Sequence, residues 1–192
     1  MSQNNISPTQ PVSKKYYSFD PKCEVSGMSL GAILRSLRAP IYQKHIQNHG
    51  LEDVQPDQWY PLSKWMDFCN ALKEDGAASP NFVSIGLKLA SGMPPVADGQ
   101  SYEEIVMAHP RLYHQTHRNG FDGFYAVEKI SDTHFKVTTK VPYPDDLVYG
   151  SLYGEARRYL PDDVAFTVAY DREITRRDHG GEYTVIHITL SK

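Results

Sequence analysis

The sequence predicts an α+β domain in which an N-terminal helical half packs on a four-stranded antiparallel sheet. Apolar residues recur with helical spacing as far as Gly120, and strand-like alternation replaces that spacing afterwards. The second half has the predicted order β-β-α-β-β. One crossover helix lying on a four-stranded antiparallel sheet accounts for that order.

Five helices are expected before Gly120, after a short strand within residues 16–25. Ser101 and Glu104 form the pattern of a capping box, and Gly120 is a typical helix stop. A stripe of apolar residues marks the third helix as amphipathic. The expected helices span 28–40, 41–49, 61–75, 79–92 and 101–120.

The elements after Gly120 alternate in the way that strands do. A turn at Ser131–Asp132 makes the first two strands a hairpin, and "TRRDHGG" links the last two. The expected strands span 121–130, 134–141, 164–174 and 181–191, with a helix at 147–159.

Composition is that of an ordinary globular domain, with 40% hydrophobic and 22% charged residues among 192. We expect residues 1–15, rich in Ser, Asn, Gln and Pro, to be a flexible tail. Residues 16–192 are expected to form one domain, with its helical part at 28–120 and its sheet part at 121–190.

Charge and hydropathy exclude several classes of partner. A net charge of -3 gives no basis for bulk nucleic-acid binding, and no apolar run is long enough to span a membrane. The N-terminus lacks the apolar core of a signal peptide. Cys23 and Cys69 are expected to be reduced thiols, which favours a cytoplasmic location.

Catalytic signatures are weak. "YGSLYG" lacks the spacing of a nucleophile elbow, and "GFDGF" precedes a strand, so no helix N-terminus would face a phosphate. Asp145–Asp146 and Asp162–Asp163 are paired carboxylates, but each pair precedes a predicted element. We therefore interpret them as caps.

Three histidines lie in the fifth predicted helix. His114 and His117 share a face that a metal could use, but we favour solvated side chains, because no nearby carboxylate or cysteine completes a site. His109 falls within the apolar stripe and precedes Pro110, which removes a helical hydrogen bond. It is either a core histidine bonded to a freed carbonyl or a ligand contact.

The segment "VPYPDDLVYGSLYGEARRY" carries Gly150 and Gly154 four residues apart, which leaves one helical face bare. A bare face lets another backbone approach closely. The segment is therefore either a tightly packed crossover helix or a pocket wall whose rim carries the hydroxyls of Tyr143, Tyr149 and Tyr153.

The order of these parts resembles the superfamily of heme nitric-oxide/oxygen-binding sensor domains and 4-vinyl-reductase-type small-molecule domains. The resemblance covers residues 16–190 and rests on "WYPLSKW", "HPRLYHQTHRNGFDGFY" and "YPDDLVYGSLYGEARRY". In the heme branch a helix histidine ligates iron, and His109 stands about where that residue would. The branch also carries Y-x-S-x-R, which binds the heme propionates. Here Lys136, Thr138 and Lys140 replace Tyr, Ser and Arg.

The resemblance implies a cytoplasmic ligand-binding sensory domain that signals to a separate partner and forms a homodimer. Its ligand would be small and apolar or heme-like, with His109 as a metal ligand only if heme is bound. The alternatives are an enzyme with acid–base groups near Tyr143, Asp145 and Arg158, or a ligand-free adaptor. The expected site residues are Trp65, Phe68, Cys69, Ile105, His109, Phe124, Val137, Lys140, Tyr143 and Tyr149.

Overall fold

A four-stranded antiparallel sheet forms one end of the molecule, as the alternation after Gly120 predicts. The computed structural model describes residues 15–75, 82–91 and 100–191 of the chain. Its strands lie side by side in the order β4 (Phe124–Ser131), β5 (His134–Lys140), β7 (Thr184–Ser191) and β6 (Ala165–Tyr170).

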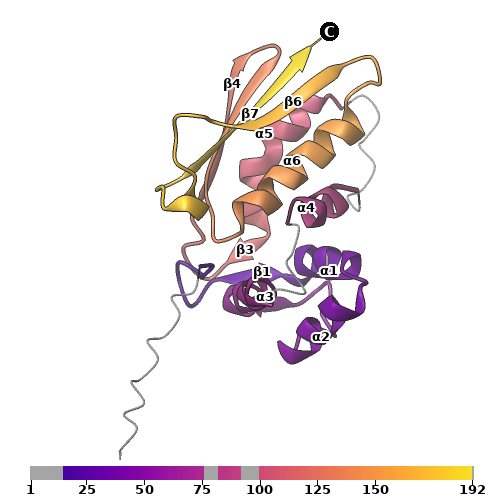
Figure 1. Cartoon of the computed structure of the whole chain (residues 1–192), viewed down its shortest axis with the longest axis vertical. Coiled ribbons are helices and arrows are strands. Elements are labelled where there is room, and N and C mark those ends of the chain that lie inside the picture. Colours follow the sequence, from indigo (N-terminus) through magenta and orange to yellow (C-terminus); the bar gives the residue numbers. More distant parts are fainter. Residues whose placement is uncertain (1–14, 76–81, 92–99, 192) are drawn as a thin grey trace, which may run out of the picture.

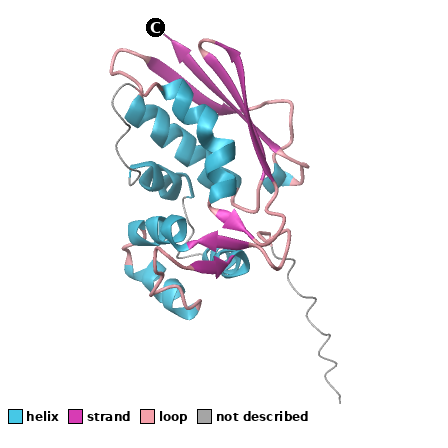
Figure 2. Ribbon diagram, turned by 180° about the vertical axis from the view of Figure 1, so that it is seen from behind, coloured by secondary structure: helices cyan, strands magenta, loops and turns pink. Residues whose placement is uncertain are grey.

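Two long helices cover one face of this sheet. Helix α6 (Asp145–Tyr159) connects β5 to β6, and α5 (Tyr102–Gln115) lies beside it (Figure 1). Phe135, Val137 and Thr139 of β5 are buried under the helices, while the residues between them are partly exposed. Seen from behind, no helix in the described part of the chain covers the other face (Figure 2). We call it the open face.

At the other end, α1 (Gly27–Ser36), α2 (Pro40–Asn48) and α3 (Leu62–Glu74) lie around a second, three-stranded sheet of order β2-β1-β3 (Figure 1). Helix α4 (Phe82–Ser91) lies between the two ends, where it packs against α6 and α1. The strands are β1 (Glu24–Ser26), β2 (Trp59–Pro61) and β3 (His117–Arg118), and a short 3-10 helix, η1 (Arg177–His179), lies between β6 and β7.

The α+β prediction is confirmed, but the small sheet was missed. The strand expected within residues 16–25 shrinks to Glu24–Ser26. The fifth helix ends at Gln115, not at Gly120, because His117–Arg118 leaves the helix to pair with β1. Strands of two or three residues are too short to show an alternating pattern in the sequence.

Other boundaries shift by a few residues. The first helix ends at Ser36, and Pro40 opens the second helix, where its fixed φ suits the first turn. Helix α6 begins at Asp145 instead of 147, so Asp145 and Asp146 stand in its first turn and Pro144 is its N-cap. The predicted caps Ser79, Pro80 and Gly92, and nearly all of the predicted tail, lie outside the described residues. No described helix is long and apolar enough to cross a membrane.

Helix α6 presses its glycine face against α4. A Cβ added at Gly150 would lie 2.2 Å from the carbonyl oxygen of Val83, and one at Gly154 would lie 2.7 Å from the Cβ of Ala90. On the facing helix, a Cβ at Gly86 would lie 2.3 Å from the carbonyl oxygen of Leu147. These glycines let the two backbones touch, so the close-packing interpretation of this helix is confirmed, although its partner there is α4 and not the sheet.

Arg158 continues the same face of α6 one turn further. Its Nη1 donates to the carbonyl oxygens of Ala90 at 2.8 Å and Ser91 at 2.7 Å, at the C-terminal end of α4. Carbonyls at a helix C-terminus have no intrahelical donor, and a cation there also favours the helix dipole. Residues 150, 154 and 158 thus form one docking stripe.

We predict that Gly154→Leu lowers the free energy of unfolding by about 1–3 kcal/mol, because the added side chain overpacks the contact with α4. Arg157→Leu, on the exposed side of the same helix, is the matched control. Chemical denaturation of both variants measures the difference. Equal stability of the two variants would contradict the tight contact.

Candidate functional site

A cluster of buried polar side chains lies where α5, α6 and β4 meet. His109 on α5 stands between two partners: its Nε2 lies 2.5 Å from Oε2 of Glu155, and its Nδ1 lies 3.1 Å from the hydroxyl of Tyr125. The His109 side chain is 12% exposed and that of Glu155 is 2% exposed. His109 is therefore mostly buried and faces the sheet, as expected from its place in the apolar stripe.

Charge attraction dominates the chemistry of this histidine. Burial alone lowers the pKa of His109, but the charge of Glu155 and the hydrogen bond to it outweigh burial and raise the pKa above its ordinary value. When the ring is protonated, both of its nitrogens donate hydrogen bonds, one to each partner. The cluster is thus a buried ion pair.

Two further hydroxyls complete the cluster. Ser151, one turn before Glu155 on α6, donates to its Oε1 at 3.1 Å. The buried hydroxyl of Tyr102 on α5 has no hydrogen-bond partner among the described residues. Burial, followed by the negative charge of Glu155, raises the pKa of the Tyr102 phenol. The cluster therefore keeps one unused hydrogen-bonding group inside the core.

Sequence reasoning missed Glu155, although a signal was present. Glu155 lies between Leu152 and Ala156, which are both fully buried, so an acid stands on an apolar face of the predicted helix. Such an acid needs a cationic partner, and His109 was the histidine already placed inside a core.

The expected site residues are distributed over several parts of the fold. Trp65, Phe68 and Cys69 are fully buried on α3, which contacts α2 and β2. The rings of Trp65 and Phe68 stack with centroids 5.0 Å apart. Ile105 is buried on α5, the helix of His109, and Val137 is fully buried on the inner face of β5.

Of the three expected rim tyrosines, Tyr143 and Tyr149 use their hydroxyls in hydrogen bonds within the fold. The hydroxyl of Tyr143 donates to Nε2 of His117 at 2.7 Å, and Nδ1 of His117 donates to the carbonyl of Tyr113 at 2.8 Å. His117 is buried, not solvated as expected, and burial lowers its pKa. Tyr149 is half-buried and donates to the carbonyl of Val168 in β6 at 3.0 Å.

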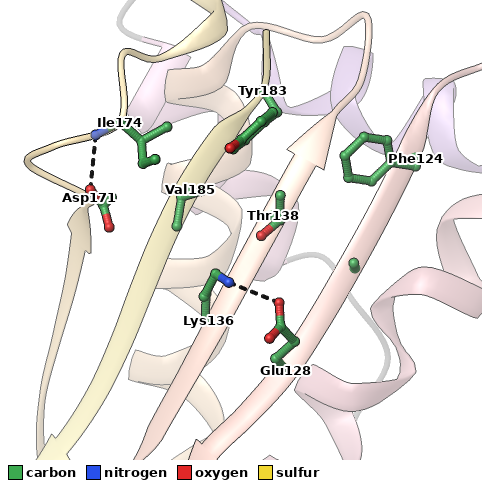
Figure 3. Close-up of a pocket in the computed structure, with 9 residues that line it drawn as sticks. Phe124, Glu128, Lys136, Thr138, Asp171, Ile174, Tyr183 and Val185 are labelled. Atoms are coloured by element: carbon green, nitrogen blue, oxygen red, sulfur yellow. Dashed lines mark hydrogen bonds and ion pairs between the residues drawn. The ribbon is translucent and has the colours of Figure 1, made fainter. Parts of the chain in front are cut away.

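Phe124 and Lys140 belong to the open face of the sheet. Phe124 is 38% exposed and lines a pocket of about 490 Å³ there. Lys136 and Thr138 line it as well, and they face the same side of β5 as Lys140 because they are alternate residues of that strand (Figure 3). Lys140 forms an ion pair with Glu182 at 3.2 Å. These side chains are therefore on the opposite side of the sheet from His109.

The arrangement does not fit heme at His109. Both nitrogens of that ring are bonded to protein groups, so neither is free to ligate iron. Lys136 and Thr138, in place of the propionate-binding pattern, face the open side of the sheet. Among the described residues, no three His, Cys, Asp or Glu side chains gather so as to hold a metal ion. Cys23 and Cys69 are free and buried.

Comparison with solved structures identifies the architecture. An H-NOX protein from S. oneidensis in the Fe(II)NO ligation state matches with a TM-score of 0.65 and 12% identity, covering 87% of this chain and 99% of that chain. A mutant H-NOX from T. tengcongensis matches with a TM-score of 0.63 and 12% identity, covering 87% and 98%. No protein-family model and no curated protein sequence matches. The chain has the fold of H-NOX domains.

Proposed function

We propose that the chain is a small-molecule-sensing domain with an H-NOX-like fold that passes a signal to a separate protein partner. The observation that carries this proposal is the buried His109–Glu155 pair, which joins α5 to α6 and, through Tyr125, to β4. Buried ionisable groups paired with a specific charge partner are often found at functional sites in proteins.

The energetics of the pair favour a responsive role. Taking two charges out of water is costly, and a well-packed apolar pair of similar size is often at least as stable. The charges are kept at the junction of three elements, so a shift of any one element alters the geometry of both hydrogen bonds. A ligand that moves α5 against α6 would therefore also change the hydrogen bond between His109 and Tyr125 on β4.

The proposed ligand is a small molecule other than heme, because His109 has no nitrogen available for iron. Homodimer formation belongs to the same proposal, and light scattering of the purified chain measures it.

An acid–base enzyme using Tyr143, Asp145 and Arg158 is not supported. Asp145 and Arg158 stand at opposite ends of α6, about 20 Å apart at 1.5 Å per residue. Asp145 is occupied by hydrogen bonds from the backbone N–H of Asp178 and the hydroxyl of Thr184. A ligand-free adaptor is the second candidate, and the stacked, fully buried Trp65 and Phe68 favour it, because they leave that part of the core closed.

We predict that the wild-type chain gives no protein-bound Soret band when one equivalent of hemin is added, measured by absorption from about 350 to 650 nm. His109→Ala should behave in the same way. A Soret shift in the wild type that His109→Ala abolishes would show that His109 leaves Glu155 to ligate iron, and would overturn the non-heme proposal.

If the chain is a sensing domain, we expect it to retain a small molecule from the cells in which it is produced. Small molecules released by denaturing the purified chain are identified by mass spectrometry and added back. We predict that the ligand changes tryptophan emission in the wild type and changes it less in Glu155→Gln, at equal occupancy. If nothing is released and no low-molecular-weight fraction of the host changes the emission, the adaptor replaces the sensor.

The His109–Glu155 pair also predicts a dependence on pH. The folded-state pKa of His109 is raised, so its stabilising contribution is full below the unfolded pKa of about 6.5 and is lost as pH rises through the folded value. The difference in unfolding free energy between wild type and His109→Gln should therefore be largest at about pH 5.5 and shrink toward pH 9. Titrating groups that do not contact His109 are common to both proteins and cancel. A difference that grows with pH would contradict a charged His109.

A further inference from the structure

The open face of the four-stranded sheet carries a pocket that the buried cluster does not explain. Its volume of about 490 Å³ lies within the range of about 300–1,000 Å³ typical of small-molecule sites. Strands β4, β5 and β7 supply its floor, which includes Ala126 and Val185, and the segment between β6 and β7 supplies one wall (Figure 3).

That wall is held in place without a ligand. Oδ1 of Asp171 accepts hydrogen bonds from the backbone N–H groups of Glu173 at 2.8 Å and Ile174 at 3.0 Å. Its Oδ2 lies 2.9 Å from Nε2 of His187 on β7. These bonds fix the turn that carries Ile174, which lines the pocket. A preformed wall lowers the ordering cost of binding.

The pocket has an aromatic end and a charged end. Phe124 and Tyr183 come from opposite sides of Thr138, whose hydroxyl has no hydrogen-bond partner among the described residues. Further along the strands, Nζ of Lys136 donates to Oε1 of Glu128 at 3.0 Å (Figure 3). Both side chains are about one-third to one-half exposed, so they keep donor and acceptor capacity.

We propose that this pocket binds a small, planar, uncharged heteroaromatic molecule that has a hydrogen-bond donor and acceptor on one edge. The ring would lie against Phe124 and Tyr183, and the edge would meet Lys136 and Glu128. The charges of Lys136 and Glu128 offset each other, so the pair suits a polar edge without net charge better than a single ion. This inference rests on the proposed sensing function, for which it names the site and the ligand class.

The pocket wall is connected to the helical end of the molecule. In the segment that follows Ile174, the backbone N–H of Asp178 donates to Oδ2 of Asp145 at 2.8 Å, and the N–H of Asp145 donates to Oδ2 of Asp178 at 3.0 Å. The hydroxyl of Tyr16 reaches Asp178 at 3.4 Å. The backbone of Tyr16 pairs with the side chain of Asn70 on α3, at 2.9 and 2.6 Å.

This connection offers an internal reporter. The two tryptophans, Trp59 and Trp65, lie on β2 and α3 at the helical end, and neither lines the pocket. A change in tryptophan emission on binding would therefore show that a structural change reaches the helical end of the molecule. A ligand that binds without such a change would leave the emission unchanged.

Three bicyclic probes test the site by isothermal titration: quinazolin-4-one, with a neutral lactam edge, 2-naphthoate and 2-naphthylmethylammonium. Thr138→Trp fills the pocket. Thr167→Trp, on the exposed side of β6 outside the pocket, is the matched control. Lys136→Met removes the donor and leaves the floor intact. Melting temperatures show that each variant is folded.

We expect quinazolin-4-one to bind the wild type and Thr167→Trp equally, at least ten-fold more weakly to Thr138→Trp, and more weakly to Lys136→Met. Failure of all three probes to bind, or equal binding by Thr138→Trp, would overturn the site. Tighter binding of either charged probe would overturn the ligand class. Pocket binding with unchanged tryptophan emission would leave the site standing and contradict the sensing function instead.

Discussion

Backbone contact between α4 and α6 is the constraint on which the rest of this structure depends. Gly86, Gly150 and Gly154 let the helices approach until a single added Cβ would collide with backbone or with Ala90. Once that distance is set, the rotation of α6 about its axis is set as well. One face meets α4, the face of Ser151 and Glu155 meets His109 of α5, and the face of Tyr149 meets β6. Each face of the helix has its own partner.

The buried ion pair follows from that rotation. Because α6 cannot turn or withdraw, Glu155 is held 2% exposed in the core, where an unpaired carboxylate would be very costly. His109 supplies the compensating charge and Tyr125 takes its second hydrogen bond. The same two bonds occupy the nitrogens that an iron ligand would need. An H-NOX-like fold and the absence of a free histidine nitrogen at His109 are therefore compatible, since the fold depends on helix packing and sheet order.

The features that depend on local pattern could be predicted from the sequence. The β-β-α-β-β order, the capping box at Ser101 and the crowded glycine face of α6 all follow from spacing within one segment. The small sheet could not be predicted, because its strands are two or three residues long and pair across distant parts of the chain. The partner of His109 lies 46 residues away, so no local pattern pairs them. The expected site residues were chosen mainly because they are apolar. Core residues and pocket residues are both apolar, so this criterion could not separate them.

Alternate residues of the strands face opposite sides of the sheet, so the buried ion pair lies on one side and the open pocket on the other. On β5, Phe135, Val137 and Thr139 face the helices and are buried, whereas Lys136 and Thr138 face outward into the open pocket. On β4, Tyr125 faces His109 while its neighbour Phe124 lines that pocket. A shift of register by one residue would exchange the two faces and destroy both. Phe124 and Tyr125 are neighbours on β4, so the strands join the buried ion pair to the open pocket through a single layer of backbone. A displacement of β4 would therefore change the pocket and the contact between Tyr125 and His109 together.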